Sequence, residues 1–249
     1  MMDGAGTTDS ENTAVRRHFH DELDQLQVRL MAMAGLVEQL VVKATRAVLE
    51  LDIELGEQVG VEDDAVDELE LELDDRVVRL LALHQPMAVD LRQIVATSKV
   101  VNDLERMGDH AVNVGRAATH LARRTPLPEV REIEEMVAIV REMVSDALAA
   151  YVSRNVVTAR MVCITDRKVN DLRNSLQRIL ISYMLENPKS ISAALEMLFV
   201  SQNLERIADL ATNISEDVVF LVEGRSIKHG ADHAEGDDEG HGSGASAAS

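Results

Sequence analysis

The feature that most constrains the fold of this sequence is an internal repeat. The pattern Leu-Glu-Arg-x-x-Asp-x-Ala-x-Asn occupies residues 104–113 and recurs 100 residues later at 204–213. A shift of 103 residues aligns further pairs earlier in the chain: Met33 with Met136, Val41 with Val144, and Asp63 with Asp166. The change of shift places three extra residues in the first copy near Pro86, where a turn tolerates them. The chain is therefore a tandem duplication of one structural unit.

Each copy of the repeat has the pattern of three helices. Apolar residues make up 46% of the chain and aromatic residues only 2%, a composition that favours helix packing over sandwiches and barrels. The four prolines lie where long segments of helical apolar periodicity end. We predict an all-α protein with six helices, at about residues 15–51, 54–84, 88–124, 128–153, 155–186 and 189–224.

The six helices are expected to form two tandem three-helix bundles. The first bundle would span residues 15–125 and the second residues 126–225. Residues 1–14 and the tail 226–249, which is rich in Gly, Ser and acidic residues, have no apolar pattern and are expected to be disordered.

The charge of the chain limits its partners and its location. A net charge of −19 argues against binding to nucleic acid or to an anionic membrane surface, and favours cations or basic protein surfaces. The single cysteine fits a reducing compartment, and the N-terminus lacks the apolar core of a signal peptide. No uncharged apolar stretch reaches about 18 residues, the minimum for a membrane span. We expect a cytoplasmic protein, peripheral to a membrane only through partners.

A row of side-chain oxygens runs along the third helix of each copy. Glu105, Asp109 and Asn113 are spaced i, i+4, i+8 and so share one face, opposite the apolar stripe of that helix. Like charges at this spacing repel, whereas a merely solvated face more often alternates with Lys. The row recurs in the second copy as Glu205, Asp209 and Asn213, although the residues between its members differ.

A second row is expected to face the first across the Pro86 turn. Asp67 and Asp63 lie 19 and 23 residues before Pro86, and Glu105 and Asp109 lie the same numbers of residues after it. Helices joined by a tight turn run antiparallel, so residues equidistant from the turn lie at the same height. Facing carboxylates repel unless a cation lies between them. An oxygen-only ligand set favours Mg, Ca, Mn or Fe.

The second copy repeats this arrangement about Pro188, which relates Asn170 to Glu205 and Asp166 to Asp209. The arginines within the two rows, Arg106 and Arg206, are expected to pair with neighbouring acids rather than to bind a ligand.

The two copies, over residues 18–224, resemble the repeat of the PhoU family of phosphate-transport regulators. The motifs that carry the resemblance are Asp63-x-x-Val66-Asp67, Leu81-Ala82-Leu83-His84-Gln85-Pro86, Asp90-Leu91-Arg92 and Leu104-Glu105-Arg106-x-Gly108-Asp109. The resemblance implies two three-helix bundles with multinuclear iron or zinc clusters, in a cytoplasmic and often dimeric protein. It also implies negative regulation of the phosphate regulon, through contacts with a phosphate ABC-transporter ATPase and a sensor histidine kinase.

The same resemblance implies several metal ions per chain (Fe, Mn, Zn or Mg) and a ligand set at matching positions. That set is Asp63, Asp67, Glu105, Asp109 and Asn113 in the first copy, and Asp166, Asn170, Glu205, Asp209 and Asn213 in the second. The second copy departs from the family pattern because Asn170 replaces an acid and residues 191–200 lack the Asp-Leu-Arg element. With fewer anionic ligands, the second bundle is expected to bind metal more weakly than the first.

The sequence favours a regulatory adaptor over an enzyme. It has no Ser/His/Asp or Cys/His catalytic set and no glycine-rich phosphate-binding loop. One alternative is a ferritin-like di-metal oxidase or metal-storage bundle, although such sites use Glu-x-x-His, which the predicted helices lack. A purely structural bundle with an acidic surface is the other alternative.

Overall fold

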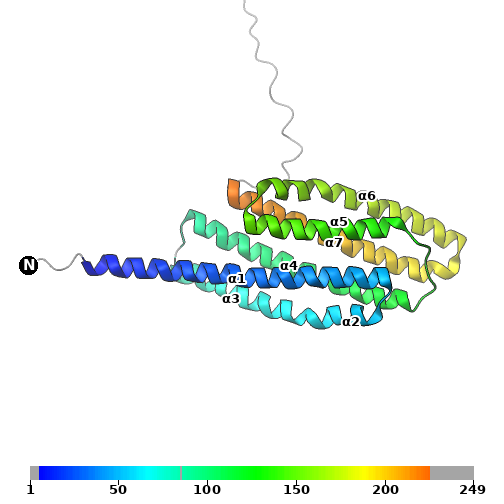
Figure 1. Ribbon diagram of the computed structural model, residues 1–249, viewed down its shortest axis with the longest axis horizontal. Helices are drawn as coiled ribbons and strands as arrows, with labels where there is room; N and C mark the ends of the chain where they lie inside the picture. Colours follow the sequence, from blue (N-terminus) through cyan, green and yellow to red (C-terminus); the bar gives the residue numbers. More distant parts are fainter. Residues whose placement is uncertain (1–5, 85, 225–249) are drawn as a thin grey trace, which may run out of the picture.

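The computed structural model describes residues 6–84 and 86–224, with side chains from residue 18 onwards, and these residues contain helices but no strand. Figure 1 shows the helices running alongside one another in an elongated bundle. They are α1 (Gly6–Glu50), α2 (Ile53–Glu62), α3 (Asp64–His84), α4 (Ala88–Ala122), α5 (Arg131–Ser153), α6 (Val156–Glu186), the 3-10 turn η1 (Pro188–Ser190) and α7 (Ile191–Glu223). The prediction of an all-α fold is confirmed.

Two boundaries differ from the prediction, and the first is the start of α1. This helix begins at Gly6, so the expected disorder of residues 1–14 is wrong for residues 6–14. The sequence places Asp9 and Glu11 in the first turns, where the helix dipole favours negative charge. In Figure 1 this end of α1 extends beyond the neighbouring helices. Residues 1–5 and the predicted disordered tail 226–249 lie outside the described residues.

The second difference is a break at Asp63 in the helix predicted over residues 54–84. α2 ends at Glu62 and α3 begins at Asp64, with a tightened turn in which the Val66 N–H donates to the Asp63 carbonyl at 2.7 Å. Acidic residues cluster here, and they are unfavourable at the C-terminus of one helix but favourable at the N-terminus of the next. The acids Asp64 and Asp67 in the first turn of α3 therefore stabilise the start of the new helix, whereas Glu62 gains nothing at the end of α2. The second copy has no such break, because α6 is continuous.

The turns that end α1 and α5 are repeated in the two copies. Leu51 and Arg154, which are 103 residues apart, adopt left-handed backbone conformations with φ of 53° and 51°. A capping side chain follows each turn. The Leu55 N–H donates to Asp52 Oδ1 at 3.0 Å, and the Val157 N–H donates to Asn155 Oδ1 at the same distance. The duplication thus preserved the backbone geometry of the turn as well as the sequence pattern.

The two bundles share one hydrophobic core. α1, α2, α3 and α4 form the first bundle and α5, α6 and α7 the second, while α4 packs against α7 between them. Lys99 Nζ lies 3.1 Å from Asp217 Oδ1, and His110 Nδ1 lies 2.9 Å from Asn203 Oδ1. From the first contact to the second, the residue number increases on α4 and decreases on α7, so the two helices are antiparallel. Buried apolar side chains from both bundles form a single continuous cluster across this seam.

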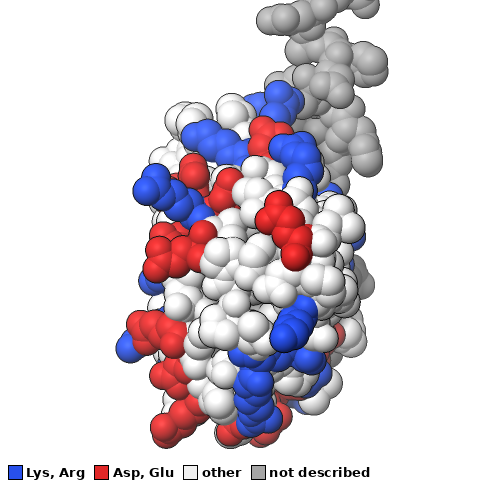
Figure 2. All heavy atoms as spheres, turned by 90° about the vertical axis from the view of Figure 1, so that its right-hand side faces the viewer, with Lys and Arg blue, Asp and Glu red and all other residues white. Residues whose placement is uncertain are grey.

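One end of the molecule is mixed in charge despite the net charge of the chain. Figure 2 shows the end of the molecule that lies at the right of Figure 1, where Lys and Arg side chains are interspersed with Asp and Glu. Within the described residues, every helix is too short or too polar to cross a lipid bilayer.

Candidate metal centre

The oxygen row on α4 has the orientation that its spacing predicts. Residues of the apolar stripe, including Leu104, Met107 and Ala111, are completely buried. Glu105 is half-buried and Asp109 is exposed, so this face of α4 turns away from the core contact. The helix thus presents its carboxylates beside α3.

The acidic row of the α2–α3 segment lies against the α4 row. Burial and the negative charges of Asp67 and Asp109 raise the pKa of Asp63 to about 6. Burial, then the charges of Asp109 and Glu70, raises the pKa of Glu105 to about 7. Carboxyl groups from both rows therefore act on one another at close range, as the antiparallel hairpin predicts.

Glu70 is a member of this cluster that the sequence-based reasoning missed. It lies seven residues after Asp63 and three after Asp67, and so shares their face of the helix. Burial, followed by the charges of Asp74, Asp67 and Asp109, raises its pKa. The helical spacing was the signal that could have identified it.

The carboxylate of Asp63 occupies a space that a glycine leaves open. Its Oδ1 atom is buried and has no hydrogen-bond partner among the described residues. A Cβ added to Gly108 would lie only 2.6 Å from this oxygen, so a side chain there would displace it. Gly108 on α4 is therefore a positioning residue for Asp63. The matching residue in the second copy is Ala208, which is completely buried.

In the second bundle the corresponding acids have partners within the protein. Asn170 Nδ2 donates to Asp166 Oδ2 at 2.9 Å, and Arg206 Nη1 lies 3.2 Å from Asp209 Oδ2. Burial, then the charges of Asp209 and Glu205, raises the pKa of Asp166, while the Asn170 hydrogen bond opposes that rise. The rows face each other as in the first bundle, but their charge is partly compensated.

Arg173 adds a guanidinium to this cluster as an ion-pair partner, although its Nε makes no hydrogen bond to the described residues. Its Nε lies 3.3 Å from Glu205 Oε1, and both side chains are largely buried, at 29% and 15% exposure. Arg173 stands 103 residues after Glu70, at the same position of the repeat. A guanidinium in the second bundle thus occupies the place that a carboxylate takes in the first.

Two of the three asparagines of the predicted ligand set, Asn113 and Asn213, lie at the ends of the rows beyond the acids. Asn113 is half-buried on α4, one turn beyond Asp109. Asn213 lines two cavities that also contain Arg106, at the seam between α4 and α7.

The side chains of the first bundle fit a bound cation better than those of the second. Asp63, Asp67, Glu70, Glu105 and Asp109 bring five carboxylates together. The buried, unpartnered Oδ1 of Asp63 has a counterpart in Asp166 Oδ1 of the second bundle, so the contrast lies in the number of carboxylates and not in this atom. Among the described residues, no three Asp, Glu, His or Cys side chains already form a metal-binding group, so the carboxylates would have to rotate to ligate an ion.

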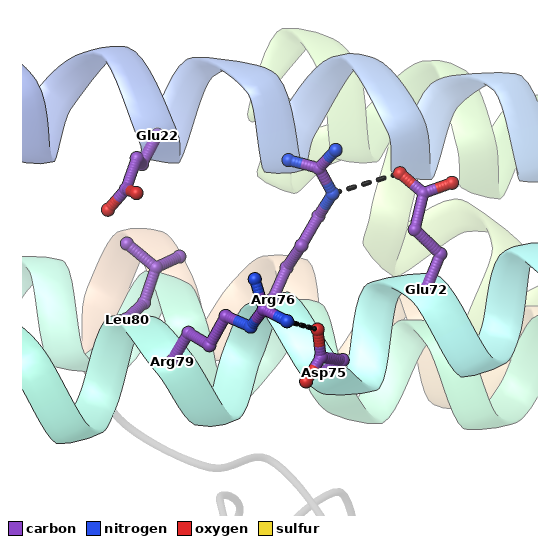
Figure 3. Close-up of a pocket in the computed structure, with 6 residues that line it drawn as sticks. All are labelled: Glu22, Glu72, Asp75, Arg76, Arg79 and Leu80. Carbon is purple, nitrogen blue, oxygen red and sulfur yellow. Dashed lines mark hydrogen bonds and ion pairs between the residues drawn. The ribbon is translucent and has the colours of Figure 1, made fainter.

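A hollow between α1 and α3 shows a different balance of charge. It has a volume of about 210 Å³ and is shown in Figure 3. Arg76 Nε donates to Glu72 Oε1 at 2.9 Å, and Arg79 Nη2 lies 2.8 Å from Asp75 Oδ2. The third acid, Glu22, lies 2.8 Å from His84 Nε2. Because each acid of this hollow already has a partner, the hollow has little remaining capacity for a cation.

The fold and the paired acidic rows define a class of protein. It consists of two repeated helical bundles, each with facing oxygen side chains on two antiparallel helical segments, α2–α3 with α4 and α6 with α7. The PhoU domain family model matches the chain twice, over residues 30–118 and 133–218. The chain belongs to the PhoU family.

Individual relatives cover most of the chain. It is 40% identical over 208 residues to the phosphate-specific transport system accessory protein PhoU homolog of Aquifex aeolicus, covering 84% of this chain and 94% of that protein. The crystal structure of PhoU from Pseudomonas aeruginosa matches with a TM-score of 0.81 and 38% identity, covering 83% of this chain and 100% of that one. The phosphate transport system regulatory protein PhoU of Streptococcus pneumoniae gives a TM-score of 0.77 at 28% identity, covering 84% and 98%.

Proposed function

We propose that this chain is a regulatory accessory protein of a phosphate transport system. It represses the phosphate regulon and limits phosphate uptake, through contacts with a phosphate ABC-transporter ATPase and a sensor histidine kinase. The observation that supports this most is the double match to the PhoU domain along the duplicated fold. We infer that the protein works by binding partners rather than by catalysis, in the cytoplasm and as a homodimer.

The proposal includes a metal ion at the first bundle. The carboxylates of Asp63, Asp67, Glu70, Glu105 and Asp109 would hold Fe, Mn, Zn or Mg. Such an ion supplies positive charge that offsets their mutual repulsion and fixes α3 against α4. The unpartnered oxygen of Asp63 and the raised pKa of Glu105 support this assignment.

Deletion of the gene in its native host tests the regulatory role. With phosphate plentiful, we expect derepressed phosphate-starvation genes and increased phosphate uptake, both restored by the wild-type chain. Unchanged expression and unchanged uptake would contradict the proposal. Pull-down of the tagged chain from phosphate-replete cells should recover the transporter ATPase and the kinase.

Thermal unfolding of the purified protein tests the metal site separately. An ion that binds only the folded state raises the melting temperature, because binding stabilises by RT ln(1 + [L]/Kd). For Asp109→Ala and its counterpart Asp209→Ala we compare the amount of bound metal and the shift in melting temperature that metal causes. Asp109→Ala should lose more of both. Identical melting with chelator and with Mn, Fe, Zn or Mg would contradict a metal site. Oxygen consumption with ferrous iron would instead support the di-metal oxidase alternative.

A further inference from the structure

A small cavity at the seam between α4 and α7 brings together two arginines from equivalent positions of the repeat. The cavity has a volume of about 290 Å³, and Arg106 and Arg206 both line it. The two residues are 100 positions apart, and the antiparallel packing of α4 on α7 directs both side chains to one place. The sequence alone suggested only that each would pair with a nearby acid.

The guanidinium of Arg106 is not strongly engaged. Its nearest carboxylate oxygen, Asp103 Oδ1, lies 3.9 Å from Nη1, beyond hydrogen-bond distance, and the described residues give Arg106 no hydrogen bond. Arg206 contacts Asp209 at 3.2 Å through Nη1. Arginine carries five N–H donors, so each guanidinium retains donors for a further ligand.

Two other polar groups in the cavity indicate the kind of ligand. The hydroxyl oxygen of Thr212 is buried and has no hydrogen-bond partner among the described residues. Asn203 Nδ2 donates to the Phe199 carbonyl at 2.8 Å, so its Oδ1 accepts from His110 Nδ1–H at 2.9 Å. With Nδ1 engaged by Asn203, Nε2 is the ring nitrogen of His110 that is left for a ligand in the cavity.

The charge and the size of the cavity narrow the ligand further. The residues that line the cavity include two guanidiniums and one carboxylate, that of Asp209, and the carboxylate of Asp103 lies 3.9 Å from Arg106. Each arginine thus has one acid nearby but retains unused donors. The adjoining cavity is lined by four acids, Glu70, Asp74, Asp103 and Asp217, together with Lys99 and Arg106, so it is less favourable for an anion. A volume of 290 Å³ suits a small ion with its water rather than a nucleotide.

We propose that this seam cavity binds a small tetrahedral oxyanion, with inorganic phosphate as the probe. Arg106 and Arg206 donate charge-assisted hydrogen bonds, and the Thr212 hydroxyl donates a further bond. Since Arg106 belongs to α4 whereas Arg206 and Thr212 belong to α7, binding ties the two helices together. The binding groups differ from the carboxylates of the proposed metal cluster in the first bundle, and the inference does not depend on the proposed function.

The test is calorimetric titration of the full chain with inorganic phosphate. A chelator is present, so that phosphate cannot bind through a metal ion. We expect one saturable site with a Kd of roughly 0.1–1 mM, because the two arginines are half exposed and screened. Arg106→Gln, Arg206→Gln and Thr212→Val should each weaken binding about threefold to tenfold. Arg178→Gln is the matched control, since it removes the same charge from an exposed site on α6.

Several outcomes would overturn the proposal. One is the absence of saturable binding at phosphate concentrations up to roughly 20 mM, which is 20-fold the upper end of the expected Kd. Another is an equal loss of affinity in Arg178→Gln. Tighter binding of AMP would assign the cavity to a phosphate ester rather than to the free ion. Circular dichroism of each variant establishes that the fold is retained.

Discussion

The two bundles of this chain share an architecture but handle their buried negative charge differently. In the first bundle, Glu70 and Glu105 come together with further acids, and burial and repulsion raise the pKa of both. In the second, Arg173 stands at the position of Glu70 and contacts Glu205 at 3.3 Å. The acids of the first bundle therefore need a bound cation or protons to be neutralised, whereas the second bundle has the guanidinium of Arg173 for this purpose. Duplication allows one unit to keep a site while the other becomes structurally self-sufficient.

Exchange of the residues at this position should have the largest effect. Glu70→Arg would place a guanidinium beside Glu105, and we expect metal affinity at the first bundle to fall about a hundredfold or more. The reciprocal Arg173→Glu removes the partner of Glu205 and should lower the stability of the metal-free protein by about 2–3 kcal/mol. Metal titration and urea unfolding in chelator measure the two effects. If Glu70→Arg bound metal normally, the contrast between the bundles would be mistaken.

The pH dependence of the metal-free protein should reflect the first bundle. A carboxyl whose pKa is higher in the folded state binds its proton more tightly there. Its stabilising contribution is present below the unfolded pKa and is lost as pH rises through the folded value. For Asp63 and Glu105, with folded pKa values of about 6 and about 7, the loss falls between roughly pH 4 and 7.5.

After allowance for solvent screening, we expect this loss to be about 1–3 kcal/mol. Urea unfolding at pH 5 and pH 8 in chelator measures it. Glu105→Gln should reduce the difference between the two pH values. The control, Glu205→Gln, should instead lower stability because it leaves Arg173 without its acid. A wild-type protein that was more stable at pH 8 would reverse the expected sign.

Substitution of the glycine beneath Asp63 should have a smaller effect. In Gly108→Ala the new Cβ forces Asp63 Oδ1 to move, and the short side chain can rotate to permit this. We expect metal affinity to fall about tenfold, with a stability change within about 1 kcal/mol. The matched variant Ala208→Gly in the second bundle should leave metal binding by the first bundle unchanged. Equal effects of the two substitutions would remove the positioning role of Gly108.

The repeated left-handed turns should give the smallest effect. A residue with a Cβ is strained at the φ of 53° that Leu51 adopts, so Leu51→Gly should raise stability by about 0.5–1 kcal/mol. The equivalent Arg154→Gly should gain less, because Arg154 Nη2 donates to Gln93 Oε1 at 2.9 Å and that bond is lost. Thermal unfolding of both variants makes the comparison, and a larger gain for Arg154→Gly would contradict it.

Much of the fold was predictable because the duplication and the helical periodicity reinforce each other. The predicted facing of Asp63 with Asp109 followed from counting residues about Pro86, since a helix has a fixed rise. The break at Asp63 was not predicted, because apolar periodicity continues through it. Glu70 was overlooked although its spacing places it on the same face.

Other parts of the site depend on how the two bundles pack. The meeting of Arg106 with Arg206 requires the antiparallel register of α4 on α7, which no pattern within either helix encodes. The difference between Glu70 and Arg173 could have been read from the sequence by comparing the two copies position by position.

The single core that spans both bundles has a consequence for how this chain can be divided. The apolar faces of α4 and α7 that meet at the seam would be exposed to water if either repeat stood alone. An isolated half would therefore tend to self-associate or to remain only loosely folded. Joining the two repeats in one chain keeps these faces together at any protein concentration, which two separate halves could not do.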